Sequence, residues 1–93
     1  MAVFAIVRGG GSIDDYRRVR EALDFDVTPP AGLILHTMAD VEGTLQAIDV
    51  WESCQEAQEF YEDRLRPAVA ELAPANSPFP PIEIHELTAI LQP

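Results

Sequence analysis

Hydrophobic residues recur along the chain first with a strand-like and then with a helix-like period, and each change of period marks a predicted element. Residues 2–7, AVFAIV, form a short apolar run that ends at Arg8, a pattern typical of a buried strand. From Ser12 onward, apolar residues recur at helical spacing with charged residues between them, which predicts an amphipathic helix. Its apolar positions are Ile13, Tyr16, Val19 and Leu23.

The glycines at 9–11 raise the question of a phosphate-binding loop, because such loops are glycine-rich and precede a helix. Ser12 is a preferred N-cap residue, and Asp14 and Asp15 complement the positive end of the helix dipole. Negative charge therefore already occupies the place that a phosphate would take. Neither the Walker pattern nor G-x-G-x-x-G is present. We interpret the segment as a flexible corner between strand and helix.

The middle of the chain predicts a β-hairpin followed by a second helix. Pro29 and Pro30 end the first helical region, because proline lacks an amide proton and restricts its own backbone and that of the residue before it. Residues 32–51 then follow the pattern of strand, turn and strand, with a tight turn at 40–43.

Ser53 and Glu56 form a capping box, which is the usual start of a helix. Apolar residues continue from there at helical spacing as far as Leu72. Pro67 falls inside this pattern and predicts a kink or a break near 64–66, since it removes one backbone donor and crowds the preceding turn.

The end of the chain completes the fold class. Residues 73–81 predict an extended, proline-rich loop, and residues 82–91 predict the last strand. The order is strand, helix, strand, strand, helix, strand. It predicts an α+β, ferredoxin-like β-α-β-β-α-β sandwich, with a four-stranded antiparallel sheet and both helices on one face. A length of 93 residues fits one such domain, residues 1–93.

Asp49 decides which face of the sheet is predicted to meet the helices, because a buried carboxylate is costly unless it is paired. We therefore expect Ile48 and Val50 on the helix side, paired across the turn with Leu33 and Leu35. The helix-free face is then largely apolar, which marks an interface or a pocket, and a face-to-face homodimer would cover it. Its hairpin residues would be Ile34, His36, Met38, Leu45, Ala47, Asp49 and Trp51.

Composition narrows the classes of partner and compartment. The net charge is −10, from 16 acidic and 6 basic residues, and repels phosphate backbones and anionic lipids, so neither nucleic acid nor a membrane is a predicted partner. The single cysteine, Cys54, excludes an internal disulfide and fits a reducing compartment. The N-terminal apolar run lacks the pattern of a signal peptide, and we expect a cytoplasmic protein.

Three short motifs carry a resemblance to known proteins: Gly-Leu-x-x-His at 32–36, Asp-x-Trp-Glu-Ser at 49–53 and Arg-Leu-x-Pro-Ala at 64–68. Through them, residues 30–72 resemble the small dimeric α/β-barrel proteins that are widespread in bacteria and related to the antibiotic-biosynthesis monooxygenase and haem-degrading groups. The resemblance implies two sheets facing each other across a dimer axis. It also implies a ligand cavity between each sheet and its helices or within the barrel.

The resemblance does not extend to a haem site. Haem-degrading members use a histidine on the second helix as the iron ligand and an asparagine on the first strand, whereas residues 53–73 contain no histidine and residues 2–8 no asparagine. The two histidines of the chain also lack a spaced metal-ligand motif. We therefore predict no metal and no cofactor.

His36 and Asp49 are the candidate catalytic residues. A neutral imidazole can shuttle protons near neutral pH, and Asp49 would orient it or favour its charged form. Trp51 would stack on an aromatic ligand. If Ile82 and Ile84 pack on the helices, His85 joins His36 on the cavity face. The remaining candidate ligand-binding residues are His85, Met38, Ile34, Arg8 and Tyr61, with Glu83 as an outer candidate.

Two functional classes stay open. The first, slightly favoured, is a homodimeric protein that binds a small apolar or aromatic molecule and in which His36 and Asp49 simply satisfy one another. The second is a cofactor-independent, monooxygenase-like enzyme acting on aromatic or polyketide-like substrates, with His36 and Asp49 handling protons, as the resemblance suggests.

Overall fold

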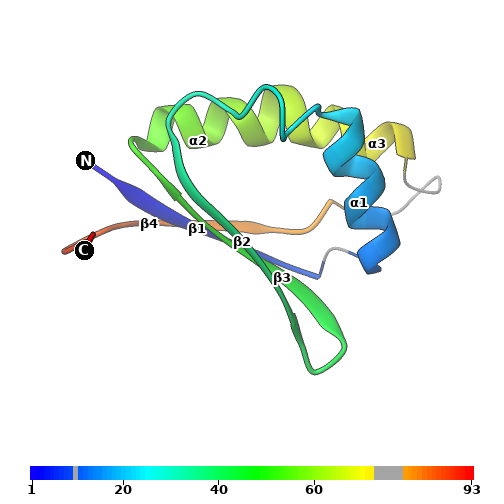
Figure 1. Cartoon of the computed structure of the whole chain (residues 1–93), viewed down its shortest axis with the longest axis horizontal. Helices are drawn as coiled ribbons and strands as arrows, with labels where there is room; N and C mark the ends of the chain where they lie inside the picture. Colours follow the sequence, from blue (N-terminus) through cyan, green and yellow to red (C-terminus); the bar gives the residue numbers. More distant parts are fainter. Residues whose placement is uncertain (10, 73–78) are drawn as a thin grey trace.

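The computed structural model describes residues 1–9, 11–72 and 79–93. An antiparallel four-stranded sheet carries its helices on one face (Figure 1), which confirms the predicted α+β, ferredoxin-like class. The strands, in the spatial order β2-β3-β1-β4, are β1 (Val3–Arg8), β2 (Leu33–Val41), β3 (Thr44–Trp51) and β4 (Ile82–Glu86). The helical segments are α1 (Ile13–Ala22), α2 (Cys54–Phe60), η1 (Tyr61–Leu65) and α3 (Arg66–Leu72).

At the corner before α1, the Asp15 carboxylate binds the backbone at the start of the helix. The Ser12 hydroxyl accepts a hydrogen bond from the Asp15 amide, and the Asp15 carboxylate accepts one from the Ser12 amide, each at 3.1 Å. These hydrogen bonds, with Arg18 nearby, lower the pKa of Asp15. The amide that a phosphate would need is therefore already taken by an ionised side chain.

The hairpin turn lies at 41–44, one residue later than the predicted 40–43. Val41 pairs with Thr44, and the residues between them, Glu42 and Gly43, have φ angles of 52° and 85°. Positive φ at both central residues is the signature of the type I′ turn, whose twist matches that of the flanking strands. The Asp40 carboxylate accepts a hydrogen bond from the Gly43 amide at 2.8 Å and fixes the turn from one side.

A β-bulge in β2 changes which residues face the helices. Leu33 pairs with Trp51 and Leu35 with Val50, so Ile34 is an extra residue with no partner on β3. Leu33 packs against the core, Leu35 is 54% exposed, and the next residue, His36, turns back to the helix side. Strict alternation would have placed His36 opposite Leu33.

The prediction of which β3 residues face the helices is also wrong, because the carboxylate of Asp49 is buried. Trp51 is fully buried against α2 and Asp49 is only 4% exposed, whereas Ile48 is 46% exposed on the helix-free face. Burial of Asp49 is tolerated because both of its carboxylate oxygens are hydrogen-bonded, by Tyr61 and His36. The helix side therefore carries the residues that were expected on the open face.

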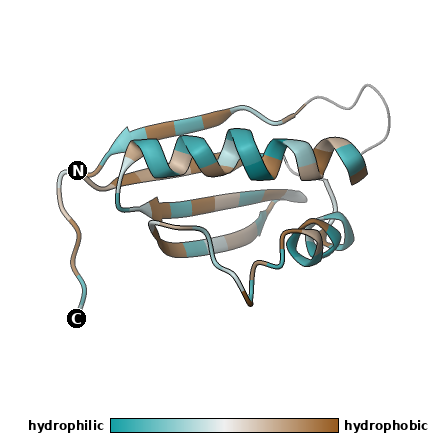
Figure 2. Cartoon of the chain, turned by 90° about the horizontal axis from the view of Figure 1, so that it is seen from above, coloured by the Kyte–Doolittle hydropathy of each residue, from teal (hydrophilic) through white to brown (hydrophobic). Residues whose placement is uncertain are grey.

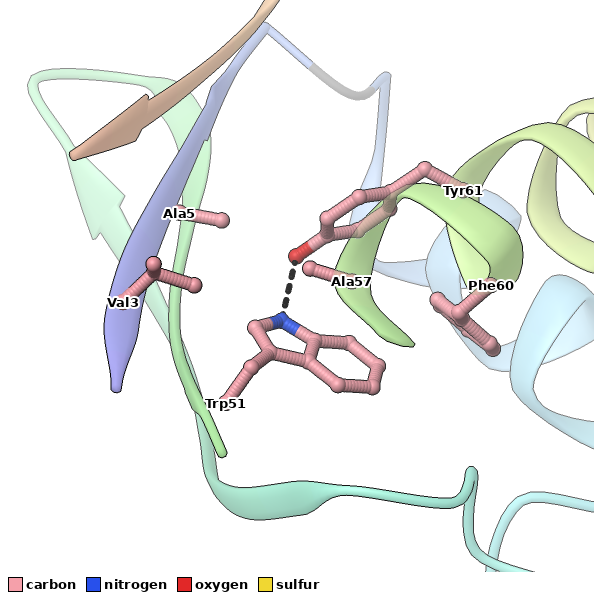
Figure 3. Packing of buried hydrophobic residues seen from close by; sticks show 6 residues of the cluster. All are labelled: Val3, Ala5, Trp51, Ala57, Phe60 and Tyr61. Atoms are coloured by element: carbon pink, nitrogen blue, oxygen red, sulfur yellow. Dashed lines mark hydrogen bonds between the residues drawn. The ribbon is translucent and has the colours of Figure 1, made fainter. Parts of the chain in front are cut away.

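The core lies between the sheet and the α2–η1 helix, as Figure 3 shows for its buried residues. Trp51 fills the centre, with ring centroids 5.4 Å from Phe60 and 5.6 Å from Tyr61. Ile82 and Ile84 of β4 also pack on this cluster, which settles the facing of the last strand that the sequence left open. Hydrophobic and hydrophilic residues alternate along the strands in Figure 2, so one side of each strand supplies the core.

The second helix is interrupted where Pro67 predicted a kink or a break. α2 passes into the π-helical segment η1, in which the Arg66 amide donates to the Tyr61 carbonyl oxygen, before α3 begins. Proline cannot donate to the regular ladder, and the wider turn precedes it. At the other end Ser53 caps α2, since its hydroxyl accepts from the Glu56 amide at 3.2 Å and donates to the Glu56 carboxylate at 3.0 Å.

The last strand is shorter than the predicted range of 82–91. Within the described residues, β4 pairs with β1 alone, with Val3 opposite Glu86, and the Leu87 amide donates the last hydrogen bond to the Ala2 carbonyl oxygen. Beyond that point no β1 backbone remains to pair with. Of the predicted loop at 73–81, residues 73–78 lie outside the described residues. Among the helices that the structure describes, none is long and apolar enough to cross a membrane.

Candidate functional site

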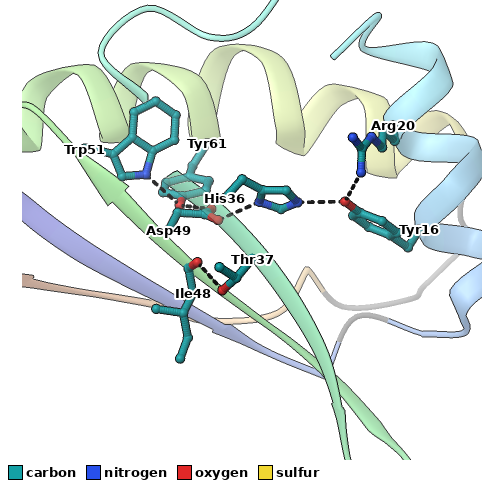
Figure 4. Close-up of polar contacts among 8 residues, drawn as sticks. All are labelled: Tyr16, Arg20, His36, Thr37, Ile48, Asp49, Trp51 and Tyr61. Atoms are coloured by element: carbon teal, nitrogen blue, oxygen red, sulfur yellow. Dashed lines mark hydrogen bonds and ion pairs between the residues drawn. The ribbon is translucent and has the colours of Figure 1, made fainter. Parts of the chain in front are cut away.

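The buried half of the candidate site is built around Asp49 on β3 (Figure 4). One carboxylate oxygen lies 2.6 Å from Nδ1 of His36, on the neighbouring strand β2. The other accepts a hydrogen bond of 2.7 Å from the Tyr61 hydroxyl, at the start of η1. The Tyr61 oxygen in turn accepts from Nε1 of Trp51 at 3.0 Å. Sheet and helix are thus joined by one hydrogen-bonded chain.

The outer half of the site comes from α1 and the loop after it. The Tyr16 hydroxyl lies 2.7 Å from Nε2 of His36, and Arg20 donates to the Tyr16 oxygen at 3.1 Å. Arg20 is itself held by Asp26, through a hydrogen bond of 3.1 Å from Nε and an ion pair from its terminal nitrogen. The Phe25 ring lies 5.0 Å from the imidazole, so His36 is enclosed between aromatic side chains.

Some side chains of the network can only donate or only accept hydrogen bonds, and they fix the direction of the bonds around Asp49. Trp51 can only donate, so the Tyr61 hydrogen points to Asp49. The ionised carboxylate of Asp49 can only accept, so Nδ1 of His36 carries a proton. With a neutral imidazole, Nε2 is then an acceptor, and it receives the hydroxyl hydrogen of Tyr16. His36 is held in one tautomer by contacts on both ring nitrogens.

The surroundings of Tyr61 favour the protonated form of its hydroxyl. Burial raises the pKa of its hydroxyl well above the usual range, and the adjacent charge of Asp49 raises the pKa further. Because the folded-state pKa is the higher one, this stabilising contribution is complete below the ordinary tyrosine value and is lost as pH rises above it. Tyr61 therefore acts as a fixed hydrogen-bond donor to Asp49.

A cavity of about 530 Å³ opens between α1 and the β2–β3 hairpin. His36 and Tyr16 contribute its polar wall, together with Arg20. Asp49 lies behind His36, outside the lining. The residues that line the cavity are Ile13, Tyr16, Arg20, His36, Met38, Ala39, Asp40 and Leu45.

The structure brings together several of the residues that the sequence singled out. His36 and Asp49 are in direct contact, and Tyr61 and Trp51 complete the buried side of the same network. Trp51 is enclosed in the core and does not line the cavity, whereas Met38 does.

Other predicted residues lie elsewhere. His85 alternates with Ile84 on β4 and contacts Phe4 at a ring distance of 5.3 Å, so the expectation that it shares a face with His36 is wrong. Arg8 forms an ion pair with Glu83 and lowers the pKa of that carboxylate. Ile34 sits at the bulge and is not among the cavity-lining residues.

Tyr16 and Arg20 are the site residues that sequence reasoning missed. Tyr16 occupies an apolar position of the α1 pattern, and its ring was counted only as hydrophobic surface. A signal was nevertheless present, because Tyr16 and Arg20 are four residues apart and therefore share one helix face. A hydroxyl and a guanidinium on the buried side of an amphipathic helix are expected to meet polar partners on the sheet.

Comparison with known proteins was made on sequence and on structure. The sequence matches no protein-family model, and no curated protein matches it significantly. Solved structures do match. Rv0793 from Mycobacterium tuberculosis superposes with a TM-score of 0.71 at 12% identity, over 99% of this chain and 100% of that one. A "putative antibiotic biosynthesis monooxygenase" from Deinococcus radiodurans gives 0.68 at 11% identity, over 99% and 97%.

SnoaB from Streptomyces nogalater, a cofactor-independent oxygenase, gives a TM-score of 0.57 at 18% identity, over 98% of this chain and 95% of that one. Likeness at these identities establishes the fold alone. The description of the Deinococcus radiodurans protein names the antibiotic biosynthesis monooxygenase group, which residues 30–72 of this chain resemble. The chain has the ferredoxin-like fold of the antibiotic biosynthesis monooxygenase-like proteins.

Proposed function

We propose that the chain binds a small apolar or aromatic molecule in the cavity between α1 and the β2–β3 hairpin. The observation that carries the proposal is the cavity itself, which combines apolar and polar side chains and has a hydrogen-bonded histidine in its wall. Its volume of about 530 Å³ lies within the range of small-molecule sites. Ile13, Met38 and Leu45 supply apolar surface, while Tyr16 and His36 offer convergent polar groups.

We further propose that the functional unit is a homodimer formed through the helix-free face of the sheet. Phe4 and Ile6 of β1 alternate with the buried Val3 and Ala5 and so point away from the helices. They are opposite Val50 and Ile48, and Leu35 extends the same surface. A contiguous apolar patch of this kind on one side of a sheet favours association with a second copy.

A second candidate is a cofactor-independent, monooxygenase-like enzyme that acts on aromatic or polyketide-like substrates. It is favoured by the His36–Asp49 contact of 2.6 Å at the wall of the cavity, and by the description of SnoaB as a cofactor-independent oxygenase. In this role His36 would accept the proton of an acidic substrate, and Asp49 would stabilise the imidazolium that forms. Dioxygen would be the co-substrate.

Calorimetric titration with naphthalene and 2-naphthol tests the binding proposal. Ile13 is partly exposed at the cavity, so Ile13→Trp should fill the cavity at little cost to the fold, whereas Val27→Trp adds the same ring away from it. We expect the wild type to bind a probe, Ile13→Trp to lose at least about tenfold in affinity, and Val27→Trp to bind as the wild type. Absence of saturable binding, or equal loss in both variants, would contradict the proposal.

Oxygen uptake distinguishes the enzyme from the binding protein. A hydroxynaphthalene such as 1,4-dihydroxynaphthalene can supply electrons to dioxygen once it has lost a proton. Protein-dependent uptake that disappears in His36→Gln, with the affinity for naphthalene retained, would support the enzyme. Uptake equal to that of the buffer, or unchanged in the variant, leaves His36 without a role in such a reaction.

A further inference from the structure

We propose that Tyr16 is the group that accepts a proton from a ligand in the cavity, and that the His36–Asp49 pair behind it receives the proton that Tyr16 gives up in exchange. The ligand class is thereby narrowed to hydroxyaromatic compounds with an ionisable O–H. This inference rests on the proposed binding function, because it needs the cavity to be occupied.

His36 lines the cavity, but its outer ring nitrogen is occupied by Tyr16. The Tyr16 hydroxyl lies 2.7 Å from Nε2, and Nδ1 of the same ring is held by Asp49 at 2.6 Å. Both ring nitrogens are therefore engaged, and neither is free to meet a ligand directly. A ligand that acts on His36 must either displace the Tyr16 side chain or act through its hydroxyl group.

The Tyr16 oxygen can accept one more hydrogen bond than it receives within the protein. The Tyr16 oxygen donates its hydrogen to Nε2 and accepts a hydrogen bond from Arg20. A hydroxyl oxygen has two acceptor lone pairs, so one is left for a hydrogen-bond donor. Tyr16 and Arg20 both line the cavity, so this lone pair is available to a ligand O–H there.

The relay then balances without any further reactant. The ligand O–H bond breaks and its proton binds the Tyr16 oxygen, while the Tyr16 O–H bond breaks and its proton binds Nε2 of His36. The Tyr16 hydroxyl is regenerated with its hydrogen turned toward the ligand oxygen. The products are a ligand oxyanion and an imidazolium paired with the Asp49 carboxylate, which Tyr61 holds from its other side.

Charges around the cavity favour a phenol over a ligand with a permanent negative charge. Arg20 lies next to the place where the oxyanion forms, but Asp26 already neutralises much of its charge. Asp40, on the hairpin, also lines the cavity. A carboxylate or sulfate would enter against Asp40, whereas a phenol enters neutral and gains its charge only beside Arg20.

4-Nitrophenol is a suitable probe, because its phenolate absorbs at a longer wavelength than its neutral form, and nitrobenzene is the matched probe without the hydroxyl. We expect 4-nitrophenol bound to the wild type to ionise at least about one pH unit below the free compound. In Tyr16→Phe it should bind within about threefold of the wild type but ionise close to the free compound. Val27→Ala, at a position that is 77% exposed and does not line the cavity, is the control and should behave as the wild type.

The outcomes separate this inference from the function on which it rests. Failure of the wild type to bind either probe overturns the binding function and the relay together. Binding of nitrobenzene without 4-nitrophenol, or of 4-nitrophenol with no shift in its ionisation, overturns the relay alone. A shift that survives in Tyr16→Phe but vanishes in His36→Gln also overturns it, because His36 would then meet the ligand directly.

Discussion

Asp49 is a carboxylate in the interior of the protein, and its two oxygens are held by side chains from different elements. Tyr61 reaches it from the helix and His36 from the neighbouring strand. Within the described chain, no buried side-chain polar atom lacks a partner. A buried charge that is paired in this way adds little net stability. Removing one of its partners is nevertheless destabilising, because the charge is then left unpaired in an apolar core.

Tyr61→Phe should therefore be clearly destabilising although it removes a single oxygen. It leaves Nε1 of Trp51 without an acceptor and one oxygen of Asp49 without a donor. A buried polar group left unpaired costs about 1–3 kcal/mol. Urea denaturation followed by Trp51 fluorescence measures the change. Tyr16→Phe is the control and should cost less, since Tyr16 lines an open cavity that water can enter. Equal costs would contradict this account.

At the residue scale, sequence could suggest which side chains carry chemistry but not where they point. His36 and Asp49 were identified correctly as neighbours, since the hairpin register followed from the turn. The facing of Asp49 was wrong because its hydroxyl partner lies on a helix, and no local pattern shows that Tyr61 would reach it. Tyr16 was overlooked for a different reason, because it occupies an apolar position of the helical pattern and its spacing from Arg20 was not used.

The elements are joined at points where backbone geometry is specialised. η1 begins at Tyr61, so the π-helical turn lies at the residue that holds Asp49. At the start of β2, Gly32 has a φ of 82°, and a Cβ there would lie 2.4 Å from the Glu56 side chain. Glu56 is also the partner of the Ser53 cap. The entry to β2 and the cap of α2 are thus packed as one unit.

Gly32→Ala and Gly43→Ala form a matched pair that measures this packing. Their φ angles, 82° and 85°, are nearly equal, but a Cβ at Gly43 meets nothing within 4 Å. Gly43→Ala should cost about 1–2 kcal/mol from backbone strain alone. Gly32→Ala should cost about 1 kcal/mol more, because the Glu56 carboxylate must leave the Ser53 hydroxyl. Thermal unfolding compares the two, and an equal or reversed order would contradict the packing argument.

Element order, the hairpin turn and the helix interruption were all predictable, because periodicity, Gly43 and Pro67 are local signals. The bulge and the early end of β4 were not. Leu33, Ile34 and Leu35 are all apolar, so nothing in the sequence marks which of them leaves the ladder. The end of β4 depends on where β1 begins, which is a pairing partner far away in the chain.

The whole molecule is a sheet covered on one side only, with both termini at the same end (Figures 1 and 2). The uncovered side carries an apolar patch next to the polar residues Glu83 and His85 of β4, and the patch residues differ from those expected from the sequence. Its character was predictable because β1 is apolar on both faces, so either choice of facing left a hydrophobic surface to be covered.

Ile48→Arg tests the dimer. Ile48 is 46% exposed on the helix-free face, so the charged side chain should be tolerated in one subunit but not between two desolvated sheets. Sedimentation velocity should show a dimer for the wild type and a monomer, with unchanged circular dichroism, for the variant. Val27→Arg places the same charge at a site that is 77% exposed, away from that face, and should remain a dimer. A monomeric wild type would refute the assembly.

The position of Ile34 outside the strand ladder determines which codon deletions the gene could tolerate in β2. Since this residue has no partner on β3, loss of its codon would join Leu33 to Leu35 and leave both Leu33 and His36 facing the helices as they do now. Loss of the Thr37 codon would instead turn Met38 and every later residue of β2 to the opposite face. Relatives of this chain are therefore free to differ in length at Ile34, but not two or three codons further on.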